Sequence, residues 1–351
     1  MSTLWPLIAE LPLTIDGYAL ERLERDVSSA FTRVSTVVRL SGAGSEGVGE
    51  DVVYDAADQD VLQQAGTSLP LAGDWTIASF CDHIEALELF PEPPQMPVSR
   101  RYRIWTYESA ALDLACRQAS RPLHEILGRS PRPVRFVVSL RLGDPASMAP
   151  LRARLDAYPS LQFKLDPTAD WSGELVAALA ATGAVESVDF KGQYHGTIVD
   201  SAPDPALYER VLRELPEAWI EDPHTGSPEV DAVLAAHRDR VSWDAPIHSV
   251  ADILDRPWPP RLVNIKPSRL GPLRDLFAAY EHCEQHGIRM YGGGQFELGP
   301  GRGQIQYLAS LFHPDGPNDV APGGYNDPEP APGLPDSPLA PRPSAVGFRW
   351  E

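Results

Sequence analysis

The chain has 351 residues, more than one small core requires, which fits one large barrel with a second domain. Its 49 acidic and 30 basic residues give a formal net charge of -19, and so acidic a surface repels phosphate backbones, which argues against nucleic acid as a partner. Three widely spaced cysteines suggest neither a disulfide framework nor a thiolate metal site, and no apolar run is long enough to span a bilayer, so we expect a cytoplasmic protein without a membrane partner.

The first part of the chain, to about residue 130, mixes α and β patterns. The β-branched run at residues 33–40 predicts a strand, and the glycine-rich residues 41–49 predict a turn into a second extended piece. Residues 107–120 place alanines and leucines on one face at helical spacing, which predicts a helix. Pro131 and Pro133 then mark a boundary.

From residue 134 short apolar segments alternate with helical ones, and five of the segments stop at a charge. They are residues 163–166 (FKLD), 188–191 (VDFK), 219–223 (WIEDP), 241–244 (VSWD) and 263–267 (VNIKP). The steps between successive charges are 25, 32, 23 and 22 residues, each the length of one strand, one helix and two loops. This spacing predicts a parallel barrel over residues 131–325, with the strand-end charges at one mouth.

The remaining barrel elements follow from the same alternation. A first strand is expected at residues 135–140, a seventh at 288–291, and a weak eighth near Asp319 and Val320. The expected helices are residues 174–181, 204–215, 229–237 and 273–286, the last ended by Gly287. Two glycine clusters, at 292–294 and 299–303, are equally consistent with an anion cradle and with tight turns at the mouth.

Residues 327–351 are dense in proline, a composition typical of a linker or a disordered tail. The segment nevertheless ends with Val346, Phe348 and Trp350, which are apolar enough to dock. We therefore expect this C-terminal segment to pack on the first domain.

Three of the strand-end charges are carboxylates, Asp189, Glu221 and Asp244. Three carboxylates on adjacent strand ends repel one another strongly unless a cation lies among them. A hard cation with oxygen ligands, open to substrate, indicates magnesium. The alternative is that these are ordinary strand-end residues with no common role.

The other strand-end charges are lysines. A lysine at the position of Lys266, beside a bound cation, has a depressed pKa and becomes a usable general base, unless it only pairs with a carboxylate. Lys164 shares its strand face with Asp166 and is either catalytic or part of a structural charge cluster with Asp166 and Lys191.

Taken together these segments resemble the enolase superfamily, within its muconate-lactonizing-enzyme-like group of muconate cycloisomerases, o-succinylbenzoate synthases, acylamino-acid racemases and dipeptide epimerases. The resemblance covers nearly the whole chain. It is carried by residues 47–50 (GVGE), 107–115 (YESAALDLA), 219–223 (WIEDP), 264–271 (NIKPSRLG) and 295–299 (QFELG).

The resemblance implies an α/β fold: a modified TIM barrel, (β/α)7β, over residues 131–325. An α+β capping domain would comprise residues 1–130, with the proline-rich segment 326–351 returning to it. It implies that Asp189, Glu221 and Asp244 bind Mg2+, and that Lys266 is the sixth-strand lysine. The shared reaction begins by removing the proton next to the carboxylate of a small-molecule substrate, which gives an enediolate. A homo-oligomer is also expected.

Three strand ends depart from the group's pattern. The second strand usually carries Lys-x-Lys, but here Asp166 follows Lys164; the third usually carries Asp-x-Asn, but here Lys191 follows Asp189. The fifth usually reads Asp-Glu, but here alanine follows Asp244. Lys191 would therefore be either a relocated base or an ammonium group that weakens or replaces the metal.

Two further residues are expected at the substrate, besides Asp166. Glu297 lies in the segment that resembles the seventh strand, where an acidic residue is common, and His248 follows a strand end. The substrate itself is not readable from the sequence.

The interpretation we favour is a magnesium-dependent lyase or isomerase, with Lys266 as the main acid/base and Lys164 or Lys191 assisting. The first alternative is a barrel that has lost catalysis and binds a ligand or partner. The second is an enzyme that uses a Lys–Asp pair for chemistry outside the group.

Overall fold

The computed structural model describes residues 3–28, 31–197, 199–327 and 329–351. Its N-terminal part is built around an antiparallel sheet of β2 (Gly17–Ser28), β3 (Phe31–Gly42) and β4 (Ser45–Asp51), with a smaller pair formed by β1 (Pro12–Ile15) and β5 (Gly73–Thr76). The helices of this part are α1 (Trp5–Ala9), α2 (Ala56–Ala65), α3 (Ile77–Ala86), α4 (Ser99–Gln118) and α5 (Leu123–Ile126).

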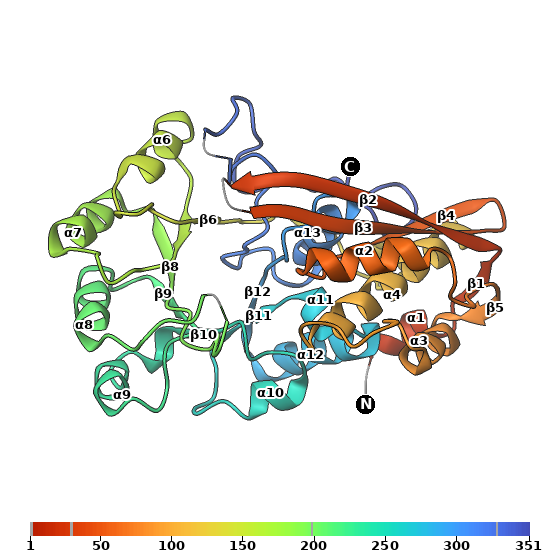
Figure 1. Ribbon diagram of the computed structural model, residues 1–351, viewed down its shortest axis with the longest axis horizontal. Helices are drawn as coiled ribbons and strands as arrows, with labels where there is room; N and C mark the ends of the chain where they lie inside the picture. The colour runs from red at the N-terminus through yellow and green to blue at the C-terminus, as the bar shows by residue number, and fades with distance from the viewer. Residues whose placement is uncertain (1–2, 29–30, 198, 328) are drawn as a thin grey trace.

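The expected hairpin is present and is longer than its sequence pattern. The strand predicted at residues 33–40 lies within β3, and the turn contains Ala43 and Gly44, both with positive φ, as tight two-residue turns require. The strand β2 was not predicted, because its exposed face is charged and its apolar residues are sparse. Figure 1 shows the β2–β3 hairpin running along the molecule towards the barrel, where Arg25 pairs with Asp327 at 2.5 Å.

Seven parallel strands form the barrel sheet, in the order in which they occur along the chain. They are β6 (Val138–Leu140), β7 (Phe163–Leu165), β8 (Val185–Asp189), β9 (Trp219–Glu221), β10 (Val241–Trp243), β11 (Leu262–Ile265) and β12 (Arg289–Gly292). The eighth position contains two isolated bridges, from Asn318 to Phe136 and from Asp319 to Gly293. These bridges close the ring between the chain before β6 and the end of β12.

The helices that follow the strands lie outside the sheet (Figure 1). They are α6 (Ala149–Ala157), α7 (Gly173–Thr182), α8 (Pro205–Glu214), α9 (Pro228–Leu234), α10 (Val250–Leu254), α11 (Pro267–Leu270), α12 (Leu273–His286) and α13 (Pro300–Phe312). The helix predicted at 273–286 is confirmed as α12, and Gly287 ends it in the left-handed conformation. The glycines at 301 and 303 lie inside α13, which corrects the expectation of a tight turn there, whereas N–H groups at the start of this segment do bind an anion, the carboxylate of Glu50.

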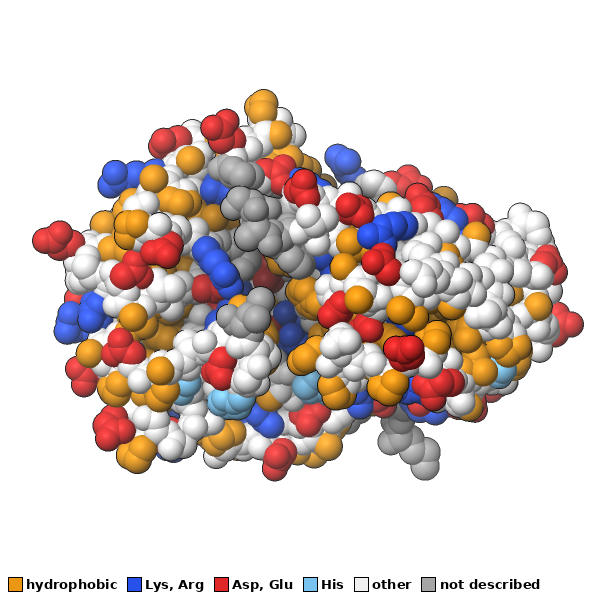
Figure 2. Space-filling model, in the orientation of Figure 1, with side chains coloured by type: hydrophobic (Ala, Val, Ile, Leu, Met, Phe, Trp, Pro, Cys, Tyr) orange, Lys and Arg blue, Asp and Glu red, His pale blue; other side chains and the backbone are white. Residues whose placement is uncertain are grey.

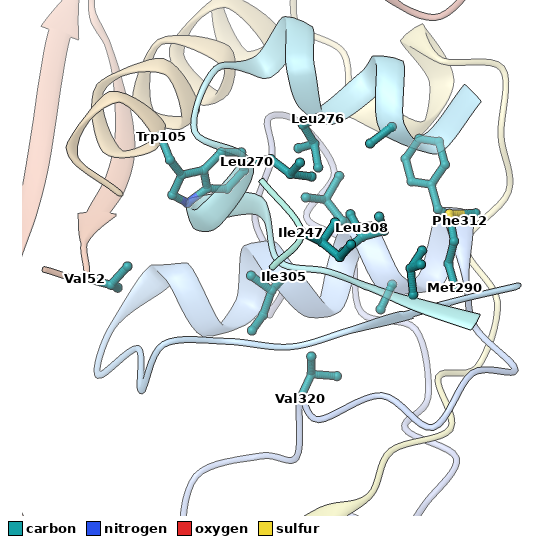
Figure 3. Close-up of a cluster of buried hydrophobic side chains, with 14 of the residues drawn as sticks. Val52, Trp105, Ile247, Leu270, Leu276, Met290, Ile305, Leu308, Phe312 and Val320 are labelled. Carbon is teal, nitrogen blue, oxygen red and sulfur yellow. The ribbon is translucent and has the colours of Figure 1, made fainter. Parts of the chain in front are cut away.

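The N-terminal part and the barrel share one hydrophobic core. Figure 3 shows Trp105 of α4 beside Leu270 of α11, with Ile305 of α13 close by. The β4 residue Gly49 also packs on α4, so close that a Cβ atom would be 2.0 Å from the Thr106 carbonyl oxygen. This close approach explains why the GVGE segment has glycine there.

Two buried residues fasten the N-terminal sheet to the loop after β12. Arg33 donates to the carbonyl oxygens of Val52, Val53, Gln295 and Phe296 at 2.7–3.2 Å. The Glu50 carboxylate accepts N–H groups from residues 298, 299 and 301 at 2.6–3.0 Å. Both residues therefore fix the N-terminal sheet against the barrel mouth.

The C-terminal residues contact α4 and the hairpin. Phe348 is fully buried, and its ring lies edge-on to Trp105 with the centroids 6.3 Å apart. Asp113 of α4 accepts the Phe348 N–H at 2.8 Å and an Arg349 Nε–H at 2.7 Å. Within the described ranges, no helix is both long and apolar enough to cross a membrane.

Candidate active site

Five neighbouring strand ends bring charged side chains to one barrel mouth. Lys164 lies in β7, Asp189 and Glu221 end β8 and β9, and Asp244 and Lys266 directly follow β10 and β11. Because the strands are parallel and Asp189 is in register with Glu221, their carboxyl ends lie side by side. All five side chains are at most 8% exposed. The structure therefore brings together the residues that the spacing singled out.

One compact group of carboxylates consists of Asp189, Glu221 and Asp222. One oxygen of each lies within 4.8 Å of the others, whereas Asp244 is outside this group. Glu221 Oε2 is buried and has no hydrogen-bond partner among the described residues. A buried carboxylate oxygen without a donor is costly, so this atom is suited to contact a cation.

Burial raises the pKa values of two of these groups. Burial raises the pKa of Glu221 well above its ordinary value, because the loss of hydration outweighs the attraction of Lys164. Burial, with Asp244 and Asp189 nearby, raises the pKa of Asp222 to about 7. Six carboxylates surround the mouth, against four cationic side chains, so the cluster carries a formal charge of -2 when every group is ionised. The carboxylates are Asp166, Asp189, Glu221, Asp222, Asp244 and Asp319, and the cations are Lys164, Lys191, Lys266 and Arg269.

Lys164 is held among three carboxylates. Its ammonium group contacts Glu221, lies 3.1 Å from Asp189 Oδ2 and 3.7 Å from Asp319 Oδ2. Burial disfavours its charge, but these carboxylates outweigh burial and raise its pKa well above the ordinary value. Lys164 is therefore an ammonium ion at neutral pH.

Lys266 behaves differently because it has one close carboxylate and two cations near it. Its Nζ donates to Asp244 Oδ2 at 2.9 Å. Burial, together with Arg269 and Lys164, outweighs Asp244 and lowers the pKa of Lys266. Asp244 also accepts from Arg269 Nη1 at 2.5 Å and from the Tyr194 hydroxyl at 3.0 Å, so it is shared by three donors.

Lys191 projects from the end of β8 beside Asp189. Its ammonium group contacts Asp189 Oδ2 and lies 3.6 Å from Asp166 Oδ1. Its φ is +56°, and Asp222 after β9 has a φ of +44°, so two residues without glycine's freedom adopt the left-handed region at the mouth. Such strain tends to gather at functional sites.

Asp222 has a second role that the sequence did not predict. Its two carboxylate oxygens accept the N–H groups of Asp244 and Ala245, each at 2.8 Å. It therefore links the end of β9 to the end of β10 and fixes where Asp244 lies. Its position directly after Glu221 was the signal available in the sequence.

The other predicted substrate contacts are occupied by neighbours. The Glu297 side chain is almost fully buried, accepts the Gln295 N–H at 2.6 Å and pairs with Arg302 at 3.2 Å. His248 lies on the loop after β10; burial and then Arg269 lower its pKa, so it is neutral at pH 7. Their roles as substrate contacts stay predictions.

Lysine occurs at only three positions in the whole chain, and all three are in this cluster. The other 27 of the 30 basic residues are arginine. This contrast is a signal that strand spacing alone does not use.

Figure 2 shows a hollow in the face between the two parts of the molecule, with basic side chains inside it.

The residues present fit a divalent cation. The observations are the unpartnered Glu221 oxygen, the raised pKa values of Glu221 and Asp222, and an all-oxygen donor set. Asp189 and Glu221 belong both to the ligand set predicted from the sequence and to the compact group of carboxylates. The two sets differ only in their third member, which is Asp244 in the first and Asp222 in the second.

Comparison with known proteins identifies the family. Residues 130–327 match the model described as "Domain of unknown function (DUF8230) C-terminal domain", and residues 6–126 match the corresponding N-terminal domain. The chain belongs to the DUF8230 family.

Two curated proteins are similar to this DUF8230 chain. N-succinylamino acid racemase of Thermus thermophilus is 26% identical over 345 residues, which cover 90% of this chain and 84% of the racemase. The o-succinylbenzoate synthase of Bacillus subtilis is 36% identical over 61 residues, only 17% of this chain and 16% of the synthase. Both relatives are enzymes.

Solved structures establish the fold. Muconate cycloisomerase from Pseudomonas fluorescens has a TM-score of 0.66 at 19% identity and covers 97% of this chain and 94% of its own. Dipeptide epimerase from Methylococcus capsulatus, complexed with Mg ion, has a TM-score of 0.64 at 19% identity, with 86% and 88% covered. The predicted barrel with an α+β N-terminal part is thereby confirmed, and its fold is that of these two enzymes.

Proposed function

We propose that this DUF8230 protein is a magnesium-dependent lyase or isomerase that removes the proton next to a substrate carboxylate. Lys266 is the base, and Lys164 or Lys191 assists. The observation that carries the proposal is that the chain's three lysines surround its buried carboxylates and that, of the three, Lys266 has a lowered pKa. A general base must be partly unprotonated near neutral pH, and burial brings Lys266 towards that state.

The environment of Lys266 suits a proton that is taken up and returned. When Lys266 accepts a proton, Asp244 Oδ2 at 2.9 Å stabilises the ammonium ion that forms. Lys164 stays charged and attracts the negative charge that develops on the substrate carboxylate. Asp222 keeps Asp244 in place through the two N–H groups that it accepts.

Asp189 and Glu221 would hold the cation. The third carboxylate is Asp244 by resemblance and Asp222 by proximity. A bound magnesium ion would supply positive charge to the substrate carboxylate as its enediolate form develops. Asp222→Asn and Asp244→Asn distinguish the two assignments, since loss of a direct ligand weakens Mn2+ binding more than loss of a positioning contact.

The named relatives support this class of reaction and a small carboxylate substrate. By their names one relative is a racemase of N-succinylamino acids, one a muconate cycloisomerase, one a dipeptide epimerase and one an o-succinylbenzoate synthase. The first three names are those of isomerases, and each of the four named compounds contains a carboxylate. The boundaries 1–130, 131–325 and 326–351, the cytoplasmic location and the homo-oligomer stay predictions.

The test is proton exchange. The protein with Mg2+ is incubated in heavy water with dipeptides, N-acylated amino acids, lactones and acid sugars, and deuterium at the α-carbon is read by NMR. We expect exchange with at least one class, and none with Lys266→Ala. Exchange that is equally fast in Lys266→Ala contradicts the assignment of the base.

A second function has one observation in its favour. Asp189 and Asp244 are already paired with the chain's own cations, as in a barrel that binds a ligand without using a metal. Saturable binding of a carboxylate without exchange, unaffected by EDTA, would favour this ligand-binding barrel.

A further inference from the structure

The ammonium group of Lys191 already contacts Asp189, which belongs to both candidate ligand sets for the cation. Lys191 contacts Asp189 twice: its ammonium group reaches Oδ2, and its backbone N–H donates to Oδ1 at 3.1 Å. Both oxygens of Asp189 therefore carry a bond from one residue. A divalent cation that binds Asp189 has to compete with this contact.

Of the two lysines on Asp189, Lys191 is the one that can leave. Lys164 is 4% exposed and is held by three carboxylates, whereas the Lys191 side chain is 19% exposed. Lys191 also has a second carboxylate within reach, because Asp166 Oδ1 is 3.6 Å away. When a cation takes Asp189, the ammonium group still has Asp166 as a partner at the edge of the mouth.

We propose that Lys191 is a built-in competitor for the divalent cation, and that cation binding moves its ammonium group from Asp189 to Asp166. This inference rests on the proposed function, since it concerns the same metal site. Its independent support is the buried Glu221 Oε2, which lacks a partner among the described residues and gives an arriving cation a second ligand beside Asp189.

The pair Asp166 and Lys191 makes this arrangement possible. Asp166 follows β7 and Lys191 follows β8, and Asp166 Oδ1 lies 3.6 Å from Lys191 Nζ. Lys191 reaches Asp189 from the left-handed region, at φ +56°. A charge this close to a ligand changes the affinity for a doubly charged ion, since two unit charges about 4 Å apart interact strongly in a partly buried site.

The test measures Mn2+ affinity directly, by the loss of the free-ion EPR signal on binding. Lys191→Gln and Lys191→Met should bind Mn2+ about tenfold or more tightly than the wild-type chain. Lys191→Arg keeps the charge and should bind about as weakly as the wild type. Arg141→Gln is the matched control, because Arg141 lies 3.4 Å from Asp166 but is 70% exposed and does not contact Asp189.

A second readout protects the test against a folding defect. Melting curves in EDTA and in Mg2+ should show a larger stabilisation by Mg2+ for Lys191→Met than for the wild type. Equal affinities in the wild type and both neutral variants overturn the proposal, and so does weaker binding in the neutral variants. If the wild type exchanges α-protons with Mg2+ while these affinities are equal, only the competitor role is lost. If no variant binds Mn2+, the metal site proposed above is lost as well.

Discussion

The docking of the C-terminus can be tested at a single side chain. Phe348 is fully buried, edge-on to Trp105 and 5.7 Å from the ring centroid of Tyr307. Replacing a fully buried phenylalanine by alanine costs about 3–5 kcal/mol, because the lost transfer free energy adds to that of the cavity left behind. A domain has about 5–15 kcal/mol of stability in total, so this one side chain is a large share of it.

The assay is guanidinium unfolding followed by tryptophan fluorescence, with wild type and variants compared at one pH. We expect Phe348→Ala to lower the free energy of unfolding by about 3–5 kcal/mol. Trp350→Ala should cost less, because Trp350 is only partly buried. The control is Leu254→Ala, whose side chain is 69% exposed and should change stability by about 0.5 kcal/mol or less.

The reasoning fails if Phe348→Ala unfolds like the Leu254→Ala control. In that case the C-terminal residues do not pack on α4 in solution, and Asp113 has to satisfy its oxygens in another way. If Phe348→Ala is destabilised but Trp350→Ala loses more, the anchor is Trp350, and burial has been assigned to the wrong ring.

Three further predictions follow from the same structure. Deleting residues 334–351 should lower the melting temperature by about several degrees, and an unchanged melting curve would mean that the segment is free. Burial raises the pKa of Glu108 to about 8, so the folded chain holds a proton that the unfolded chain releases from about pH 4.3, and stability falls as pH rises towards 8. The free energy of unfolding of Glu108→Gln, relative to that of the wild type, should therefore rise by up to about 1.4 kcal/mol per pH unit across that interval. Unfolding of both proteins at pH 5 and pH 8 measures this difference, and an equal change of stability with pH in both would contradict the prediction. Lys266→Ala should abolish α-proton exchange, whereas Lys164→Ala should slow it by a factor of about 10²–10⁴, and circular dichroism confirms that both variants fold. If Lys191→Ala shows no exchange while Lys266→Ala exchanges normally, the base is Lys191, at the end of the third barrel strand.

The barrel was predictable because its signal repeats. Short apolar segments that stop at a charge recur at intervals of about one strand plus one helix. The period is therefore visible even if one segment is assigned wrongly. The helix α13 was not predictable in the same way. A Cβ at Gly301 would lie 2.9 Å from Glu50 Oε2, so its glycine serves a contact between distant parts of the chain, and local propensity predicted a turn instead.

At the mouth the sequence predicted which residues meet but not how their charges pair. Strand spacing places Asp189, Glu221 and Lys266 together, since parallel strands end at one edge. It says nothing about Arg269, which takes one oxygen of Asp244, or about Tyr194, which comes from a loop. Side-chain direction in a loop depends on tertiary packing, so no periodic pattern predicts it.

The choice between arginine and lysine separates a structural charge cluster from a chemical one. Where this chain buries a cation for structure alone it has arginine: Arg33 donates to backbone carbonyl groups, and Arg103 pairs with Asp51 at 2.7 Å. Arginine suits that task because it stays charged and donates in fixed directions. A purely structural cluster would have the same reason to contain arginine, yet its ammonium groups are the chain's only three lysines. An amine can give up its proton, and Lys266 has the lowered pKa that this requires, so the residue choice supports proton transfer over structural ion pairing.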